Sequence, residues 1–114
     1  MRNLGILAIL IFAFAIFFVA FQMIEPTAGT AAQANAGEDL FKQHCAPCHP
    51  NGGNIVNPQK TLRQKDREAN GVKTASDIVG KTRNPGPGMT KFDEKALSNK
   101  DAQAIAEYIL KTFK

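Results

Sequence analysis

The two cysteines of this 114-residue chain are separated by two residues and are followed at once by a histidine, in the run Cys45-Ala46-Pro47-Cys48-His49. A Cys-x-x-Cys-His run is the attachment signature of a c-type haem. Each thiol can add to one vinyl group of the porphyrin, and the adjacent histidine is then carried under the ring with an imidazole nitrogen aimed at the iron. The motif therefore predicts Cys45 and Cys48 as covalent attachment points and His49 as the proximal axial ligand.

Other uses of a cysteine pair fit these residues less well. A structural zinc site takes four well-spread ligands, whereas the only other histidine is His44 and all candidates crowd into residues 44–49. A redox dithiol of the thioredoxin kind follows a strand in a βαβ unit, and no strand-rich pattern flanks the motif. A disulfide across two residues would close a very short loop and stabilise little. A dithiol and a chance match stay open as alternatives.

The N-terminal segment is a predicted export element. Residues 4–21 form an unbroken apolar run of 18 residues after the positive charge of Arg2, and such a segment engages the translocation machinery. The run exceeds the usual signal-peptide core of about 7–15 residues and approaches the length of a spanning helix. After Pro26, the small-residue patterns at 32–34 and 34–36 fit a cleavage site. Residues 1–36 are therefore expected to be a cleaved signal or a membrane anchor with a flexible linker, and both place the remainder in the periplasm or on the outer face of the cytoplasmic membrane.

Residues 37–114 are predicted to form one small domain carrying one haem. Its aromatic residues are few: Phe41, Phe92, Tyr108 and Phe113. A chain of this size with so few aromatic residues buries only a modest core by itself. A rigid, largely apolar porphyrin would supply the centre of that core.

Positive charge is concentrated in one part of the domain. The chain has a formal net charge of +4, and a basic cluster follows the motif, formed by Lys60, Arg63, Lys65, Arg67 and Lys73. Such a cluster is either a solvated helix face or a surface that steers towards an acidic protein partner or an anionic membrane. Nucleic acid is not expected as a partner, because no recognition motif accompanies the charge.

The hydrophobic pattern predicts an all-α domain with long loops. The turn-forming residues at 50–58 and 84–88 predict loops. Helices are expected over residues 38–47, over 59–69, from the capping box of Thr74 and Asp77 through Val79, and from Ser98 and Asp101 to Phe113. The pattern contains no hairpin signal and no internal repeat.

Met89 is the predicted distal axial ligand. It is the only methionine beyond the N-terminal segment, and it follows a Pro-Gly-Pro-Gly stretch that stiffens the loop and allows close backbone approach to a ligand. A lone methionine is more often core filler. His44 is a competing ligand, although it lies too close to Cys45 to swing readily to the distal face, and Lys81 and Lys91 are weaker alternatives. A thioether opposite His49 would raise the potential and close the iron, which favours electron transfer over catalysis.

The domain resembles the class I cytochromes c, and most of all the small soluble photosynthetic-type cytochromes of algae and cyanobacteria and their bacterial relatives. The resemblance covers nearly all of residues 37–114. Beside the haem motif, it rests on Gly37-x-x-x-Phe41, Gly52-Gly53-Asn54-Ile55-Val56-x-Pro58-x-Lys60-Thr61-Leu62, Ala69-Asn70-Gly71-Val72, Gly88-Met89-x-x-Phe92 and Ile105-Ala106-Glu107-Tyr108-Ile109-Leu110.

The resemblance implies a fold of three to four helices with long loops wrapped around one covalently bound haem. It implies that the first and last helices cross near Gly37 and Tyr108. It also implies that the carbonyl of Pro58 accepts the Nδ1 proton of His49, and that two further residues, Leu62 and Phe92, line the haem pocket. The chain departs from the family in having Thr90 where a proline usually follows the methionine, and Lys81 about where photosynthetic members carry a glutamine.

The sequence thus predicts a single-electron carrier that shuttles between redox partner proteins outside the cytoplasmic membrane, with no enzymatic activity and no small-molecule substrate. Two alternatives differ in class. One is a haem enzyme or small-ligand sensor, in which the sixth ligand is absent or displaceable. The other is a haem subunit of a larger membrane respiratory complex.

Overall fold

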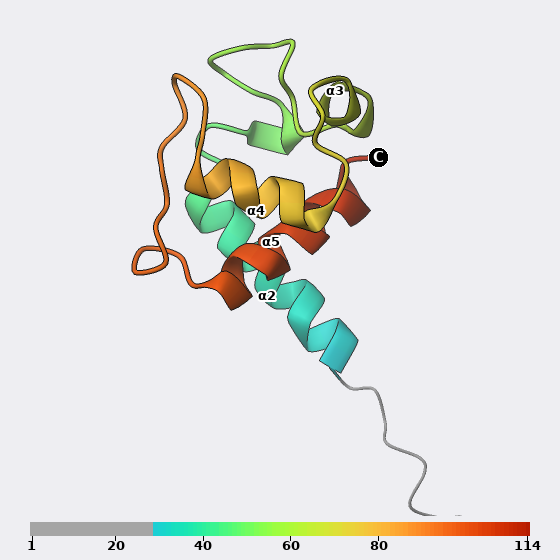
Figure 1. Ribbon diagram of the computed structural model, residues 1–114. Helices are drawn as coiled ribbons and strands as arrows, with labels where there is room; N and C mark the ends of the chain where they lie inside the picture. The colour runs from blue at the N-terminus through green and yellow to red at the C-terminus, as the bar shows by residue number, and fades with distance from the viewer. Residues whose placement is uncertain (1–28) are drawn as a thin grey trace, which may run out of the picture.

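The computed structural model describes the backbone of residues 29–114 and the side chains of residues 35–114. Four α-helices and a short 3-10 turn follow one another in this part of the chain (Figure 1): α2 (Gly29–His44), η2 (Pro50–Gly52), α3 (Gln64–Ala69), α4 (Ala75–Arg83) and α5 (Asn99–Thr112). Residues 29–114 contain no β-strand, which confirms the predicted all-α class.

The predicted export element at residues 4–21 lies outside the described residues. No helix within residues 29–114 has the length and apolar character needed to cross a membrane. Residues 29–36, expected to belong to a flexible linker, are instead the first turns of α2. This stretch is rich in alanine, the strongest helix former, which accounts for the early start.

Helix α2 also ends earlier than expected, at His44 and not near Pro47. Proline removes a backbone donor and disfavours helical backbone in the residue before it. The chain therefore leaves the helix at the haem motif, and residues 45–48 form a turn.

The helix starts predicted at Thr74 and Ser98 are confirmed. Thr74 accepts a hydrogen bond from the backbone N–H of Asp77, whose side chain accepts from the backbone of Thr74 in return. Ser98 likewise accepts from the N–H of Asp101 at the start of α5. These caps satisfy N–H groups that the first turn of a helix leaves free.

Helix α3 starts at Gln64, later than the predicted residue 59. Asn54 accepts from the N–H groups of Val56 and Asn57, and Asn57 accepts from the N–H of Gln59. Short side-chain acceptors of this kind give the backbone an alternative to helix. They keep residues 54–60 as an exposed loop between η2 and α3.

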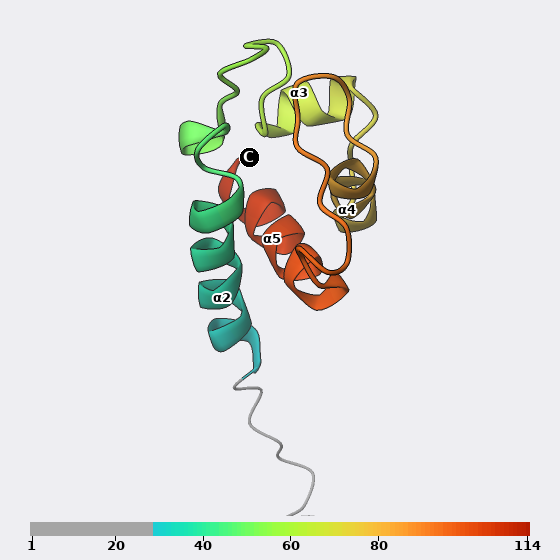
Figure 2. The same cartoon turned by 90° about the vertical axis from the view of Figure 1, so that its left-hand side faces the viewer.

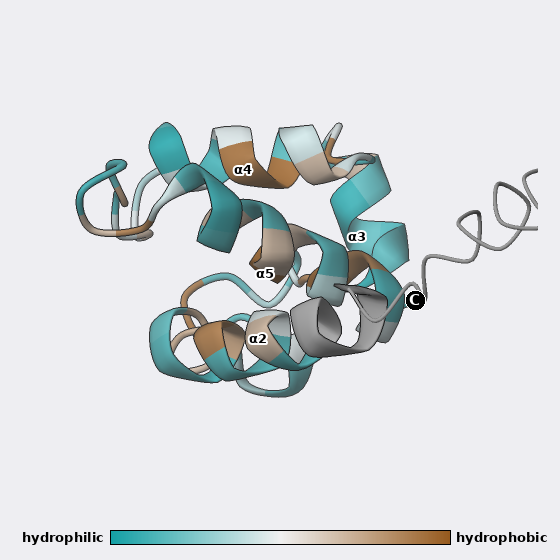
Figure 3. Cartoon of the chain, turned by 90° about the horizontal axis from the view of Figure 1, so that it is seen from below, coloured by the Kyte–Doolittle hydropathy of each residue, from teal (hydrophilic) through white to brown (hydrophobic). Residues whose placement is uncertain are grey.

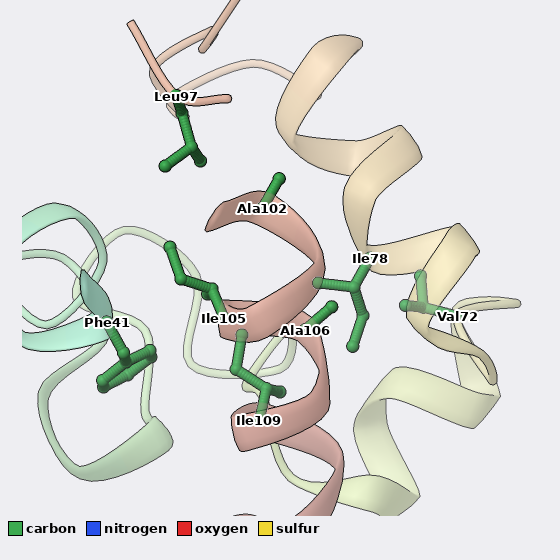
Figure 4. Packing of buried hydrophobic residues seen from close by; sticks show 8 residues of the cluster. All are labelled: Phe41, Val72, Ile78, Leu97, Ala102, Ile105, Ala106 and Ile109. Atoms are coloured by element: carbon green, nitrogen blue, oxygen red, sulfur yellow. The ribbon is translucent and has the colours of Figure 1, made fainter. Parts of the chain in front are cut away.

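Helix α5 is the centre of the domain. It packs against α2 on one side and α4 on the other, as Figures 2 and 3 show from different directions. The buried core is built around its apolar face (Figure 4) and contains Phe41, Val72, Ile78, Leu97, Ala102, Ile105, Ala106 and Ile109. Phe41 lies on one side of α5, and Ile78 and Val72 lie on the other.

Gly37 allows α2 to cross closely over α5, as the sequence predicts. A Cβ atom at this position would lie 3.0 Å from the carbonyl carbon of Ala104 and 3.2 Å from the Cβ of Tyr108. Tyr108 then reaches the Phe41 ring, with 5.3 Å between the ring centroids. The crossing sets the position of the C-terminal end of α2 relative to α5, and so the position of the haem motif that follows it.

We predict that Gly37→Ala lowers the free energy of unfolding by about 1–3 kcal/mol, since the new methyl group meets backbone atoms that cannot move aside. Urea denaturation followed by circular dichroism measures the change. Gly80→Ala is the matched control, because Gly80 is exposed in α4 and its added methyl group meets nothing within 4 Å. That change should raise stability by about 0.5–1 kcal/mol. A Gly37→Ala protein as stable as the wild type would contradict the close crossing.

Candidate haem site

The haem motif folds as a tight turn built onto the end of α2. The N–H groups of Cys45 and Ala46 both donate to the carbonyl of Phe41, at 2.8 and 2.9 Å. The N–H groups of Cys48 and His49 donate to the carbonyl of Cys45, at 3.1 and 2.8 Å. Because Phe41 is buried in the core, the turn is tied directly to the packed part of the domain.

Both cysteines are free thiols in this turn. Cys48 is exposed, whereas Cys45 is partly buried and packs against the core. Burial, with a smaller contribution from the charge of Cys48, raises the pKa of the Cys45 thiol to about 11.

The His49 imidazole is buried and held in one orientation. Its Nδ1 atom lies 2.8 Å from the carbonyl oxygen of Gly53. A carbonyl oxygen only accepts, so Nδ1 carries the proton and Nε2 is left with a free lone pair. An imidazole fixed in this way by its other nitrogen is the usual state of a metal-ligating histidine.

The acceptor for His49 differs from the expected one. The carbonyl of Pro58 was the expected acceptor, but Pro58 lies in the exposed loop and Gly53 takes its place. The reason is the η2 turn, where Asn51 and Gly52 both have positive φ (51° and 76°) and fold the chain back beneath the ring. The glycine pair was recognised in the sequence as turn-forming, but nothing in its pattern identified which carbonyl would face the imidazole.

Gly52 has a second role that the sequence did not reveal. A Cβ atom there would lie within 2.8 Å of ring carbons of Phe113, which follows α5. The N–H of Leu62 also donates to the carbonyl of Gly52, at 2.8 Å. Gly52 therefore lies where three segments meet: the haem motif, the C-terminal segment and the residues that lead into α3.

The two predicted pocket residues, Leu62 and Phe92, both pack against the buried core, as Cys45 does. The carbonyl of Leu62 accepts from Nε of Arg67 at 2.7 Å. The Phe92 ring meets the His44 imidazole edge-on, with 5.8 Å between centroids. Leu62, Phe92 and Cys45 thus all border the same buried core.

Arg67 does not belong to the surface cluster in which the sequence placed it. Its side chain is only 5% exposed and lies beneath the Leu62 segment. The other four members, Lys60, Arg63, Lys65 and Lys73, are exposed. A run of charges in sequence does not distinguish an arginine that turns inward from its solvated neighbours.

Met89 lies in the loop between α4 and α5 and is 37% exposed. Directly before it, Gly88 has a φ of 87°, and a Cβ atom there would lie 2.9 Å from Cγ1 of Val56. The Met89 loop therefore touches the loop that follows the haem motif. Of the competing ligands, Lys81 and Lys91 are exposed.

These residues fit a c-type haem. The chain offers two thiols on one turn, an imidazole that is hydrogen-bonded through Nδ1 and can bind through Nε2, and a thioether in the loop between α4 and α5. Thiols for covalent attachment with histidine and methionine for the iron are the set that cytochromes c use. Cys45, Cys48, His49 and Met89 are the residues that would hold the group.

Comparison with known proteins agrees with the fold and with a covalently attached haem. A family model described as "Cytochrome C oxidase, cbb3-type, subunit III" matches residues 32–109. The chain is 39% identical to cytochrome c6 of Rippkaea orientalis over 101 residues, which cover 89% of this chain and 87% of that protein. It is 36% identical to cytochrome c6 of Cyanidium caldarium over 80 residues, covering 70% and 72%.

Among solved structures, OmcF, the outer membrane cytochrome F of Geobacter sulfurreducens, is 50% identical and superimposes with a TM-score of 0.67, covering 68% of this chain and 99% of that one. Cytochrome c6C of Synechococcus is 32% identical with a TM-score of 0.64, covering 68% and 94%. The chain therefore belongs to the class I c-type cytochromes related to cytochrome c6, and it is an electron carrier with one covalently attached haem c.

Proposed function

We propose that His49 and Met89 are the two axial ligands and that the protein passes single electrons between partner proteins outside the cytoplasmic membrane. The observation that carries the proposal is the hydrogen bond from Nδ1 of His49 to Gly53, because it leaves Nε2 free to bind the iron. Met89 is the second ligand because it is the only methionine in residues 29–114, and it lies in a loop that touches the segment after the motif.

The bound haem supplies reversible one-electron chemistry at its iron. The chain's own residues set the conditions for that chemistry. The turn at Cys45 and Cys48 attaches the group to the end of α2, and Gly53 keeps the His49 ring in one tautomer. Leu62 and Phe92 provide apolar surface that excludes water from the site.

An iron with all six coordination positions filled supports the function of an electron carrier and not that of an enzyme. With His49 and Met89 both bound, no coordination position is left for a small molecule. The enzyme or sensor alternative requires that Met89 be absent from the iron or easily displaced.

The location proposed for the domain rests on the N-terminal segment. The positive charge of Arg2 before the apolar residues 4–21 directs export, with residues 1–36 either removed or kept as an anchor. OmcF, which is 50% identical, is described as an outer membrane cytochrome, in keeping with a site outside the cytoplasm. The haem domain at 37–114 then works in the periplasm or at a membrane surface.

The surface around the two touching loops is the proposed docking face. Ile55 and Val56 are 63% and 60% exposed, and Val56 lies against the Met89 loop. Lys60 and Arg63 follow in the same stretch and are exposed. An apolar centre beside positive charge suits a transient redox partner with an acidic face.

A second candidate function is a haem subunit of a membrane respiratory complex. The match of residues 32–109 to a family model described as an oxidase subunit favours it. Mass spectrometry of the protein purified from its own membranes separates the two roles. Retention of residues 4–21 together with co-purifying subunits would support the subunit and contradict a freely diffusing carrier.

We predict that Met89→His keeps a low-spin iron and lowers the midpoint potential by on the order of 0.1 V or more, since an imidazole replaces a thioether. The sulfur-to-iron charge-transfer band of the oxidised protein should disappear. An optically followed redox titration measures both changes. Lys91→Ala is the control in the same loop, and it should keep the band and the potential. A potential unmoved by Met89→His would show that Met89 does not bind the iron.

We predict that the double change Lys60→Glu and Lys65→Glu slows reduction by an acidic flavodoxin about tenfold at low ionic strength, because steering by the basic surface is reversed. Stopped-flow kinetics measures the rate, and added salt should shrink the difference. The matched control is Lys111→Glu with Lys114→Glu, which makes the same change in net charge at exposed C-terminal positions. Equal slowing in both proteins would argue for net charge alone and against a docking face.

A further inference from the structure

The loop that carries Met89 is closed at its base. Helix α4 ends at Arg83, and the chain returns beside it at Phe92, whose N–H donates to the carbonyl of Thr82 at 2.9 Å. Residues 84–91 therefore leave the helix and come back to the same place. Figure 1 shows this segment in orange between α4 and α5.

Hydrogen bonding within the loop is sparse. Among residues 84–91, a single backbone hydrogen bond joins two loop residues, from the N–H of Met89 to the carbonyl of Gly86 at 3.4 Å. That distance is beyond the usual range for an N–H···O bond. Apart from the fixed φ of its prolines and the close approach of Gly88 to Val56, the shape of the loop depends on how its ends are held.

Arg83 holds those ends together. Its Nη1 donates to the carbonyls of Phe92 and Asp93, at 2.9 and 3.2 Å. Its Nη2 donates to Oδ1 of Asn99, the first residue of α5, at 2.8 Å. One side chain at the last residue of α4 thus binds the segment that leaves the loop and the start of the next helix.

Arginine suits this role better than other residues. Its planar guanidinium presents several donors in a fixed fork, and hydrogen bonds from a charged donor are stronger than neutral ones. Three acceptors from two segments are bound by one group, which reduces the freedom of the loop to open.

We propose that Arg83 is a positioning residue for Met89: by clamping the base of the 84–91 loop, it keeps the thioether on the iron. This inference rests on the proposed His49/Met89 ligation. Arg83 does not itself touch the iron. It controls how readily the thioether of Met89 dissociates from the iron.

A plain structural role makes a different prediction. If Arg83 only braces α4 against α5, its loss should lower global stability and change the iron site no more than any other destabilising substitution. The bond to Asn99 belongs to that brace, whereas the bonds to Phe92 and Asp93 belong to the loop. Asn99→Ala cuts the first and leaves the others.

The test uses the oxidised full-length holoprotein and imidazole as the competing ligand. The rate at which imidazole displaces the sulfur-to-iron charge-transfer band is compared for the wild type, Arg83→Gln and Asn99→Ala. Lys100→Gln is the charge-matched control, because Lys100 is exposed in the first turn of α5 and its replacement removes the same charge. Ile78→Val is the stability-matched control, since it removes a buried methyl group from the core on the side of α5 away from Phe41.

Arg83→Gln should speed displacement about tenfold or more, as expected for the loss of charge-assisted hydrogen bonds, and should lower the midpoint potential. Asn99→Ala and both controls should stay near the wild-type rate. Arg83→Lys keeps the charge but not the fork, and it replaces Arg83→Gln if that variant yields no holoprotein, with the same expectation.

A rate for the Arg83 variant within about threefold of the Ile78→Val control would overturn the proposal, and so would an equal effect of Asn99→Ala. The experiment detects a failure of the proposed His49/Met89 ligation separately, in the spectrum of the wild-type protein. If the wild-type protein lacks the charge-transfer band, Met89 does not bind the iron. The positioning role proposed for Arg83 would then be contradicted before any variant is compared.

Discussion

The close crossing of α2 and α5 at Gly37 is the contact on which the rest of the structure depends. It lets Phe41 reach the core, where its ring meets those of Tyr108 and Phe113 at 5.3 and 5.4 Å. The carbonyl of Phe41 then holds the first turn of the haem motif, and Phe113 fills the space above Gly52. A single small residue at the crossing thus determines where the thiols and the imidazole lie relative to the packed core.

The two sides of the haem site are held in different ways. His49 belongs to a short turn whose backbone bonds to the helix before it, and Gly53 fixes its ring within four residues. Met89 belongs to a loop with little bonding of its own, joined to the domain at its base by Arg83. Thr90, which follows Met89, does not fix its own φ as a proline would, so the clamp at the base provides restraint that the sequence after the methionine lacks. Local hydrogen bonds therefore hold the turn that carries His49, whereas the loop that carries Met89 depends on a long-range contact.

Sequence patterns predicted those parts of the structure that depend on neighbours in the chain. The haem motif and the helix starts at Thr74 and Ser98 involve spacings of four residues or fewer, and the helical class followed from the hydrophobic period. The acceptor for the His49 ring was missed because it depends on positive φ angles that bring Gly53 beneath the imidazole. The inward turn of Arg67 and the bonds of Arg83 to residues 9–16 positions away were also missed. The Arg83 contacts depend on how the segment after the loop and α5 lie against α4, which no local pattern encodes.

Proton NMR of the reduced holoprotein, with its methionine methyl groups labelled, tests the central claim most directly. A methyl group bound through sulfur to the iron lies over the haem plane, and its resonance is shifted far upfield by the ring current. Ligation by His49 and Met89 predicts one such resonance, lost in Met89→His and kept in Lys91→Ala. Methionine methyl signals all at ordinary positions would contradict it.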